Sequence, residues 1–193
     1  MTPALHACAR LTALAFLSLS IAACSMSSAT LVAPKDNAKV DITGIDVEIF
    51  QVGVDAPPVA ENKKGKDFYV PEQKLIERIT PKLVAAGIPA RARLVSTLPG
   101  DPVPTPDQVF GATPANEILV LSRIKAETVC MQVCGTSTWY RVSLQDRATG
   151  NERWAARMHL GSNDRGIDGN MRAMDSFLGQ IVTELQKVVV VKS

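Results

Sequence analysis

The sequence carries little net charge, and this narrows its possible partners. Its 193 residues contain 21 Lys and Arg against 19 Asp and Glu, a formal net charge of +2. A strongly basic nucleic-acid-binding domain would show a large positive excess, so we expect no nucleic-acid partner. With 46% apolar residues, the chain does not have the composition of an acidic, disordered protein either.

Histidines and catalytic motifs are scarce. The chain has two histidines, His6 and His159, and it contains neither Gly-x-Ser-x-Gly nor the phosphate-binding patterns Gly-x-x-x-x-Gly-Lys and Gly-x-Gly-x-x-Gly. A Ser–His–Asp arrangement would therefore depend wholly on His159. We expect a protein that is not an enzyme, with no catalytic residue, no cofactor and no metal ion.

The N-terminal apolar run is too short to span a membrane. Residues 11–23 are a run of 13 mostly apolar residues after Arg10, whereas a helix needs about 20 to cross the hydrocarbon core. A basic start, a short apolar stretch and small residues at its end are typical of a secretory signal peptide. We expect residues 1–23 to be cleaved.

The end of this run resembles the lipobox of bacterial lipoproteins, since Ile21, Ala22 and Ala23 precede Cys24. The resemblance implies lipid transfer to the Cys24 thiol, cleavage before Cys24, and acylation of the new amino group, for example with palmitate. Ser25, in place of an Asp, favours the outer membrane, facing the periplasm, in a Gram-negative host. The alternative is an ordinary signal peptide with a chance cysteine at the cut.

Three regions follow from this interpretation. Residues 1–23 are the signal peptide, residues 24–41 are the lipidated cysteine with a polar, flexible tether, and residues 42–193 form a single periplasmic domain. Alternating side chains predict a strand over 42–54, with Ile45, Val47 and Ile49 on one face and Asp46, Glu48 and Phe50 on the other. A helix starting at Pro71 extends to Gly87. Pro81 either kinks this helix or lies in the first turn of a restart capped by Thr80. A strand over 88–97 and a proline-rich loop over 98–114, with a short turn at 107–110, come next.

The sequence pattern of the second half of the domain predicts three antiparallel strands and a helix. The first strand, from Ile118, places Ile118, Val120, Ile124 and Ala126 on the buried face, with Arg123 on the exposed one. Two further strands follow, over 138–146 and from Arg153 to Leu160, and alternation predicts these inward side chains: Tyr140, Val142, Leu144, Trp154, Ala156, Met158 and Leu160. An apolar stripe predicts a last helix ending near Val188, after which residues 188–191 form a short edge strand. The fold class is thus α+β: a mostly antiparallel sheet (strand-helix-strand, then a three-strand meander) with two helices packed on one face.

Cys130 and Cys134 close the first hairpin of the meander. In an oxidising periplasm we expect them to form a disulfide. A reactive thiol pair is an alternative, although the spacing is not Cys-x-x-Cys. A zinc site is another, because the topology brings His159 towards the cysteines and Asp164 could act as a fourth ligand.

The exposed face of the meander gathers basic and aromatic residues. Alternation places an aromatic side chain and four basic ones there, which we interpret as an interaction face: Trp139, Arg141, Arg153, Arg157 and His159. Arginine and aromatic side chains are enriched at protein interfaces, and they also suit anionic glycans or lipid headgroups. An ordinary solvated sheet face is the alternative.

The hairpin Asp146-x-x-Thr149-Gly150, with Trp154 four residues later, resembles a hairpin found in several envelope proteins. It is similar to those of penicillin-binding-protein activator lipoproteins, curli-assembly lipoproteins, the N-terminal domain of TolB and small outer-membrane lipoproteins. The likeness covers about residues 115–188 and implies an α+β fold and an envelope location. The proline-rich loop and the cysteine pair depart from these families, so no partner is implied.

These observations predict a lipid-anchored periplasmic accessory or adaptor protein of a bacterial envelope assembly. Its partners would be the membrane, through the N-terminal lipid, and an envelope protein. A ligand- or lipid-binding lipoprotein is the alternative, and a thiol- or metal-dependent enzyme using Cys130, Cys134 and His159 is the third.

Overall fold

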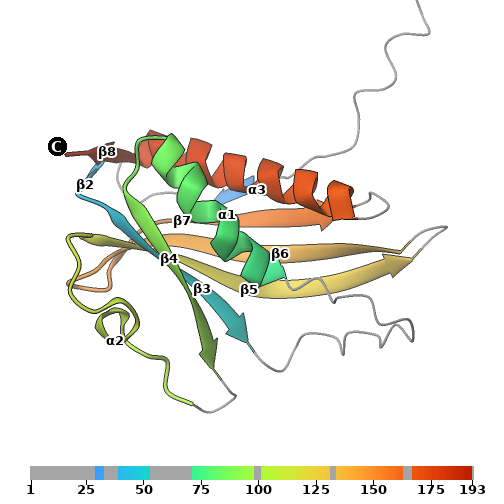
Figure 1. Cartoon of the computed structure of the whole chain (residues 1–193), viewed down its shortest axis with the longest axis horizontal. Helices are drawn as coiled ribbons and strands as arrows, with labels where there is room; N and C mark the ends of the chain where they lie inside the picture. Colours follow the sequence, from blue (N-terminus) through green and yellow to red (C-terminus); the bar gives the residue numbers. More distant parts are fainter. Residues whose placement is uncertain are drawn as a thin grey trace, which may run out of the picture.

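A computed structural model describes residues 29–32, 39–52, 71–97, 101–130, 134–162 and 167–192. The signal peptide and Cys24 lie outside these residues, so cleavage and lipidation stay predictions. The fold is α+β, as predicted, with two long helices on one face of a mostly antiparallel sheet (Figure 1).

The main sheet has six strands in the order β1-β7-β6-β5-β3-β4. Its strands are β1 (Ala29–Val32), β3 (Ile45–Val52), β4 (Ala90–Thr97), β5 (Glu117–Cys130), β6 (Cys134–Asp146) and β7 (Glu152–Ser162). The pairs β1–β7, β6–β7 and β5–β6 are antiparallel, whereas β3 pairs in parallel with both β4 and β5. A second, two-stranded sheet pairs β2 (Val40–Ile42) with β8 (Val189–Val191) in parallel.

The three helices are α1 (Pro71–Ala85), α2 (Pro106–Phe110) and α3 (Ile167–Val188). Helix α1 begins at the predicted proline and continues through Pro81, so the predicted alternative of a restart at Thr80 is wrong. Gly87, with φ +79°, lies just beyond the end of α1. Helix α2 is a single turn closed by a capping box between Thr105 and Gln108. None of the described helices is long and apolar enough to cross a membrane.

The core lies between the sheet and helices α1 and α3. From the sheet it takes the inward side chains predicted for β3, β6 and β7, and from the last helix most of the apolar stripe. Tyr140 packs against Phe177 with 5.3 Å between ring centroids. Trp154, which follows the hairpin turn, is 2% exposed. Alternation and helical periodicity therefore predicted most of this core correctly.

The predicted orientation of β5 is wrong up to Ile124, whereas Ala126 beyond it faces the helices as predicted, opposite Thr138. The register pairs Leu119 with Leu144 and Leu121 with Val142, so these leucines face the helices and Ile118 lies on the opposite side. A register shift between Arg123 and Lys125 then reverses the alternation, and Ile124 at the shift is 50% exposed. Residues 118–121 are apolar without interruption, so their sequence could not indicate which side faces the helices.

The predicted flexible tether contains a strand. Ala29–Val32 forms β1, in antiparallel register with Ala155–Met158 of β7, so the prediction of an unstructured tether is wrong over these residues. Val40 and Ile42, at the predicted domain boundary, pair with β8. The ordered sheet therefore begins five positions after Cys24 in the sequence.

Candidate functional site

Four of the five residues predicted for the interaction face come together on the side of the sheet opposite the helices. The register of β6 and β7 places Trp139 opposite His159 and Arg141 opposite Arg157. The two rings stack with centroids 4.6 Å apart and planes inclined by 30°. We call Trp139, Arg141, Arg157 and His159 the outer patch.

The ring of His159 is held in place from more than one side. Besides the stack on Trp139, its Nε2 lies 2.6 Å from the hydroxyl oxygen of Ser137. A Cβ at Gly161 would lie 2.5 Å from Cε1 of His159, so this ring position requires glycine there. The stack and the Ser137 contact hold the imidazole in place, and glycine at position 161 leaves the space that the ring occupies.

The two arginines of the outer patch differ in their surroundings. Arg141 donates to Glu152 at 2.6 Å, and both side chains are partly exposed. Arg157 is exposed and forms no ion pair or hydrogen bond with the described residues. Like charges opposite each other on neighbouring strands are unfavourable. The outer patch thus keeps one guanidinium available to an external anion.

Arg153, the fifth predicted residue, has a different role. A register shift between Leu144 and Gln145 displaces it, and its guanidinium forms an ion pair with Asp146 and lies 4.0 Å from Glu117. Asp146 also accepts hydrogen bonds from the backbone N–H and the hydroxyl of Thr149, at 2.8 and 2.9 Å. These bonds, and those from Arg153, lower the pKa of Asp146. Arg153 therefore belongs to the turn.

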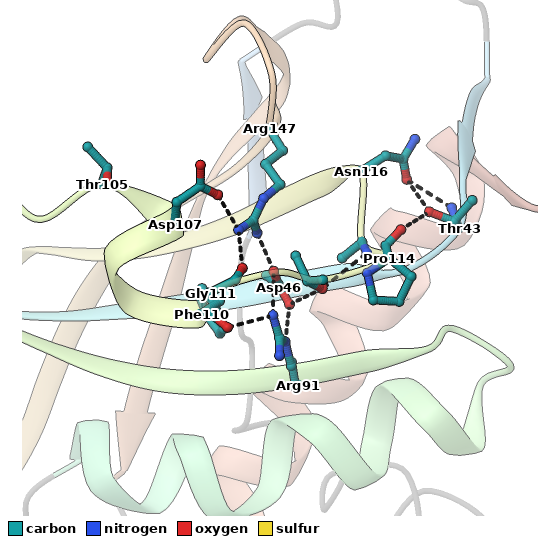
Figure 2. Close-up of polar contacts among 12 residues, drawn as sticks. Thr43, Asp46, Arg91, Thr105, Asp107, Phe110, Gly111, Pro114, Asn116 and Arg147 are labelled. Carbon is teal, nitrogen blue, oxygen red and sulfur yellow. Dashed lines mark hydrogen bonds and ion pairs between the residues drawn. The ribbon is translucent and has the colours of Figure 1, made fainter.

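A polar cluster not recognised in the sequence lies where α2 meets the sheet (Figure 2). Asp46 of β3 is fully buried, and its carboxylate accepts hydrogen bonds from Arg91, at 2.6 Å from Nε, and from Arg147. Arg147 also donates to Asp107 at 2.7 Å and to the carbonyl of Gly111 at 3.1 Å. One guanidinium thus joins the sheet, α2 and the loop after it; we call this the Arg147 clamp.

Two other buried carboxyls belong to strands of the main sheet, Glu48 to β3 and Glu117 to the start of β5. Burial raises the pKa of Glu48 to about 7, against the opposing effect of Arg147, and its Oε1 has no hydrogen-bond partner among the described residues. Burial also raises the pKa of Glu117 to about 7, and its Oε2 is similarly unpartnered. Both groups therefore change charge near neutral pH.

A shallow pocket of about 210 Å³ adjoins the Arg147 clamp. It lies between the starts of β3 and β4 and residues 113–115, and Asp46 and Arg91 contribute to its lining. The remaining lining is mainly apolar side chain and backbone. Because Asp46 is already neutralised by two arginines, we interpret the cluster as structural.

The cysteine predictions remain open. The backbone places Cys130 opposite Cys134 across the β5–β6 hairpin, but their side chains are outside the description. The disulfide therefore stays a prediction. Asp164, the suggested fourth zinc ligand, lies outside the described residues, and within those residues no three His, Cys, Asp or Glu side chains form a metal-binding group.

No protein-family model and no curated protein matches the chain. Two crystal forms of the PelC dodecamer from Paraburkholderia phytofirmans do match in structure, at 14% identity and with TM-scores of 0.50 and 0.51. Each match covers 83% of this chain and 98% of the PelC chain. At this identity the likeness shows a shared fold alone. Lipoprotein GNA1162 from Neisseria meningitidis matches more weakly, with a TM-score of 0.40, 16% identity, and coverage of 75% and 99% of the two chains.

Proposed function

We propose that the mature chain is a lipid-anchored, non-catalytic accessory protein of a bacterial envelope assembly, held at the outer membrane and facing the periplasm. The observation that carries this proposal is the position of Cys24. It follows an aliphatic and two small residues at the end of the apolar run, where a lipoprotein is cleaved and acylated. One acyl chain gives marginal membrane binding and two or more give stable anchoring.

The folded domain supports an accessory role. The outer patch is an open surface of arginine and aromatic side chains, a composition enriched at interfaces. The PelC chains that share the fold form a dodecamer, so assembly of several copies is a further state to test for this protein. A ligand- or lipid-binding lipoprotein using the outer patch is the second candidate.

Metabolic labelling with an alkyne analogue of palmitate tests the anchor. We expect the wild-type protein to be labelled and to enter the detergent phase on Triton X-114 partition. Cys24→Ala should lose the label because the acceptor thiol is gone. Cys8→Ala is the matched control: it removes a cysteine from the signal region and should keep the label. Label retained by Cys24→Ala would refute lipidation at this site.

Cross-linking in intact membranes tests the accessory role. A stoichiometric protein partner, or a defined multimer of the chain, supports an assembly component. Recovery of lipid or small molecules alone supports the second candidate.

A further inference from the structure

The anchor and the outer patch are close in the chain and in the fold. Only four residues separate Cys24 from Ala29, the first residue of β1. Such a connection reaches at most about 18 Å when fully extended. β1 starts opposite Met158, the residue before His159. The acylated cysteine therefore lies within about 18 Å of Ala29, whose partner on β7 adjoins a residue of the outer patch.

The side chains in this neighbourhood suit the surface of a membrane. Arg157 is exposed without a counter-ion among the described residues, and Lys125 is in register with Trp139. Guanidinium groups pair with phosphate through two parallel hydrogen bonds. Tryptophan is enriched at the level of lipid headgroups. The strand register places these residues on the face of the sheet opposite the long helices, and α1 and α3 both lie on the other face (Figure 1).

We propose that the outer patch binds anionic phospholipid headgroups of the membrane that carries the anchor, with Arg157 as the main phosphate contact. This inference rests on the lipid anchor of the proposed function. The patch has Glu127 and Glu152 as neighbours, which pair with Lys125 and Arg141, so its intrinsic affinity is modest. The anchor compensates, because it makes headgroup binding effectively intramolecular. The domain would then lie with its outer patch against the bilayer.

Trp139 provides the test. The full-length mature lipoprotein is reconstituted into phosphatidylethanolamine vesicles with or without phosphatidylglycerol, and quenching of its fluorescence by neutral acrylamide is measured. The other tryptophan, Trp154, is 2% exposed and gives a constant background. We expect phosphatidylglycerol to protect Trp139, and added salt to reverse the protection.

Charge reversal identifies the contact. Each basic group near an anionic leaflet changes association about five-fold, so Arg157→Glu should lower the equilibrium constant for docking about thirty-fold and abolish the protection. Arg157→Lys should keep most of it. Lys74→Glu is the matched control, because Lys74 is an exposed basic residue of α1, which packs on the face of the sheet opposite the outer patch. Far-UV circular dichroism checks that each variant is folded.

Several outcomes would overturn the inference. One is protein that floats with the vesicles while Trp139 remains equally quenched with and without phosphatidylglycerol. Another is protection of Trp139 by soluble polygalacturonate on neutral vesicles, which would identify an acidic glycan as the occupant. Protection independent of lipid composition would point to a second copy or another protein. Failure of the wild-type protein to float would instead refute the anchor, and the headgroup contact with it.

Discussion

Two buried acidic residues on β3 differ in how well their charge is compensated. Asp46 and Glu48 alternate with the inward apolar residues of β3, and alternation correctly places them on the other side. Their burial was not predictable from β3, because it comes from residues far away in sequence. Asp46 is neutralised by arginines, whereas Glu48 keeps an unpartnered oxygen. A buried carboxyl without full compensation favours its neutral form.

The raised pKa of Glu48 predicts a pH-dependent effect of Glu48→Gln. The folded carboxyl titrates near pH 7 and the unfolded one near 4.5, so the folded state binds more protons between these values. The destabilisation by ionised Glu48 is thus fully present above pH 7 and absent below 4.5. Glu48→Gln should raise the free energy of unfolding above pH 7, by up to roughly 3 kcal/mol from the size of the shift. The gain should vanish near pH 4.

Urea denaturation across this pH range measures the effect. Glu77→Gln is the control, because Glu77 is an exposed residue of α1 paired with Lys74. Its effect should stay within about 0.5 kcal/mol. A Glu48→Gln curve parallel to that of the wild type would show that Glu48 is not the titrating group. Glu117 remains in both proteins and contributes equally to each curve.

At the scale of elements, sequence patterns predicted where helices and strands lie better than how they contact one another. Pro71 and the apolar spacing marked the start and face of α1, and the short turn within the proline-rich loop is α2. The bulge in β5 and the Arg147 clamp could not be predicted, since both depend on pairings between distant segments. Arg147 and Asp46 are 101 residues apart. For the outer patch, alternation brought four of five residues together, and a register shift removed Arg153.

We expect the Arg147 clamp to hold α2 against the sheet. Arg147→Met would remove one of two guanidinium partners from fully buried Asp46 and both contacts to the α2 region. Removing one partner of a buried pair costs about 3–5 kcal/mol. Because Arg91 still compensates Asp46, we expect a loss of about 2–4 kcal/mol. The amide hydrogen exchange rate over residues 106–111 should increase more than the exchange rate in β6.

Arg153→Met is the matched comparison, since Arg153 is partly exposed and pairs with Asp146 at the neighbouring turn. It should cost less than about 1 kcal/mol and leave exchange in α2 unchanged. Equal losses for the two variants would mean that the Arg147 clamp adds nothing beyond an ordinary surface pair.

For the whole molecule, the two ends of the domain meet in a contact that local sequence did not reveal. The valine run at the C-terminus suggested an edge strand, but its partner is β2, at the N-terminal boundary of the domain. Lys192 donates its backbone N–H to the carbonyl of Ile42 at 2.8 Å. Pairing between segments almost 150 residues apart depends on the complete fold. Local periodicity carries no information about it, whereas the layered α+β arrangement follows from periodicity alone.

This contact predicts opposite outcomes for adjacent valines. Val189 is 6% exposed and belongs to the core, whereas Val190 is 42% exposed. Val189→Asp would bury a carboxylate without a partner and should lower the free energy of unfolding by about 3 kcal/mol or more. Val190 points to solvent opposite Asp41, so the uncharged variant Val190→Asn adds no like charge there and should change it by less than about 0.5 kcal/mol. Chemical denaturation of both variants at pH 7 compares them, and similar stabilities would mean that β8 is not docked. Loss of β8 should also increase amide exchange in its partner strand β2, Val40–Ile42.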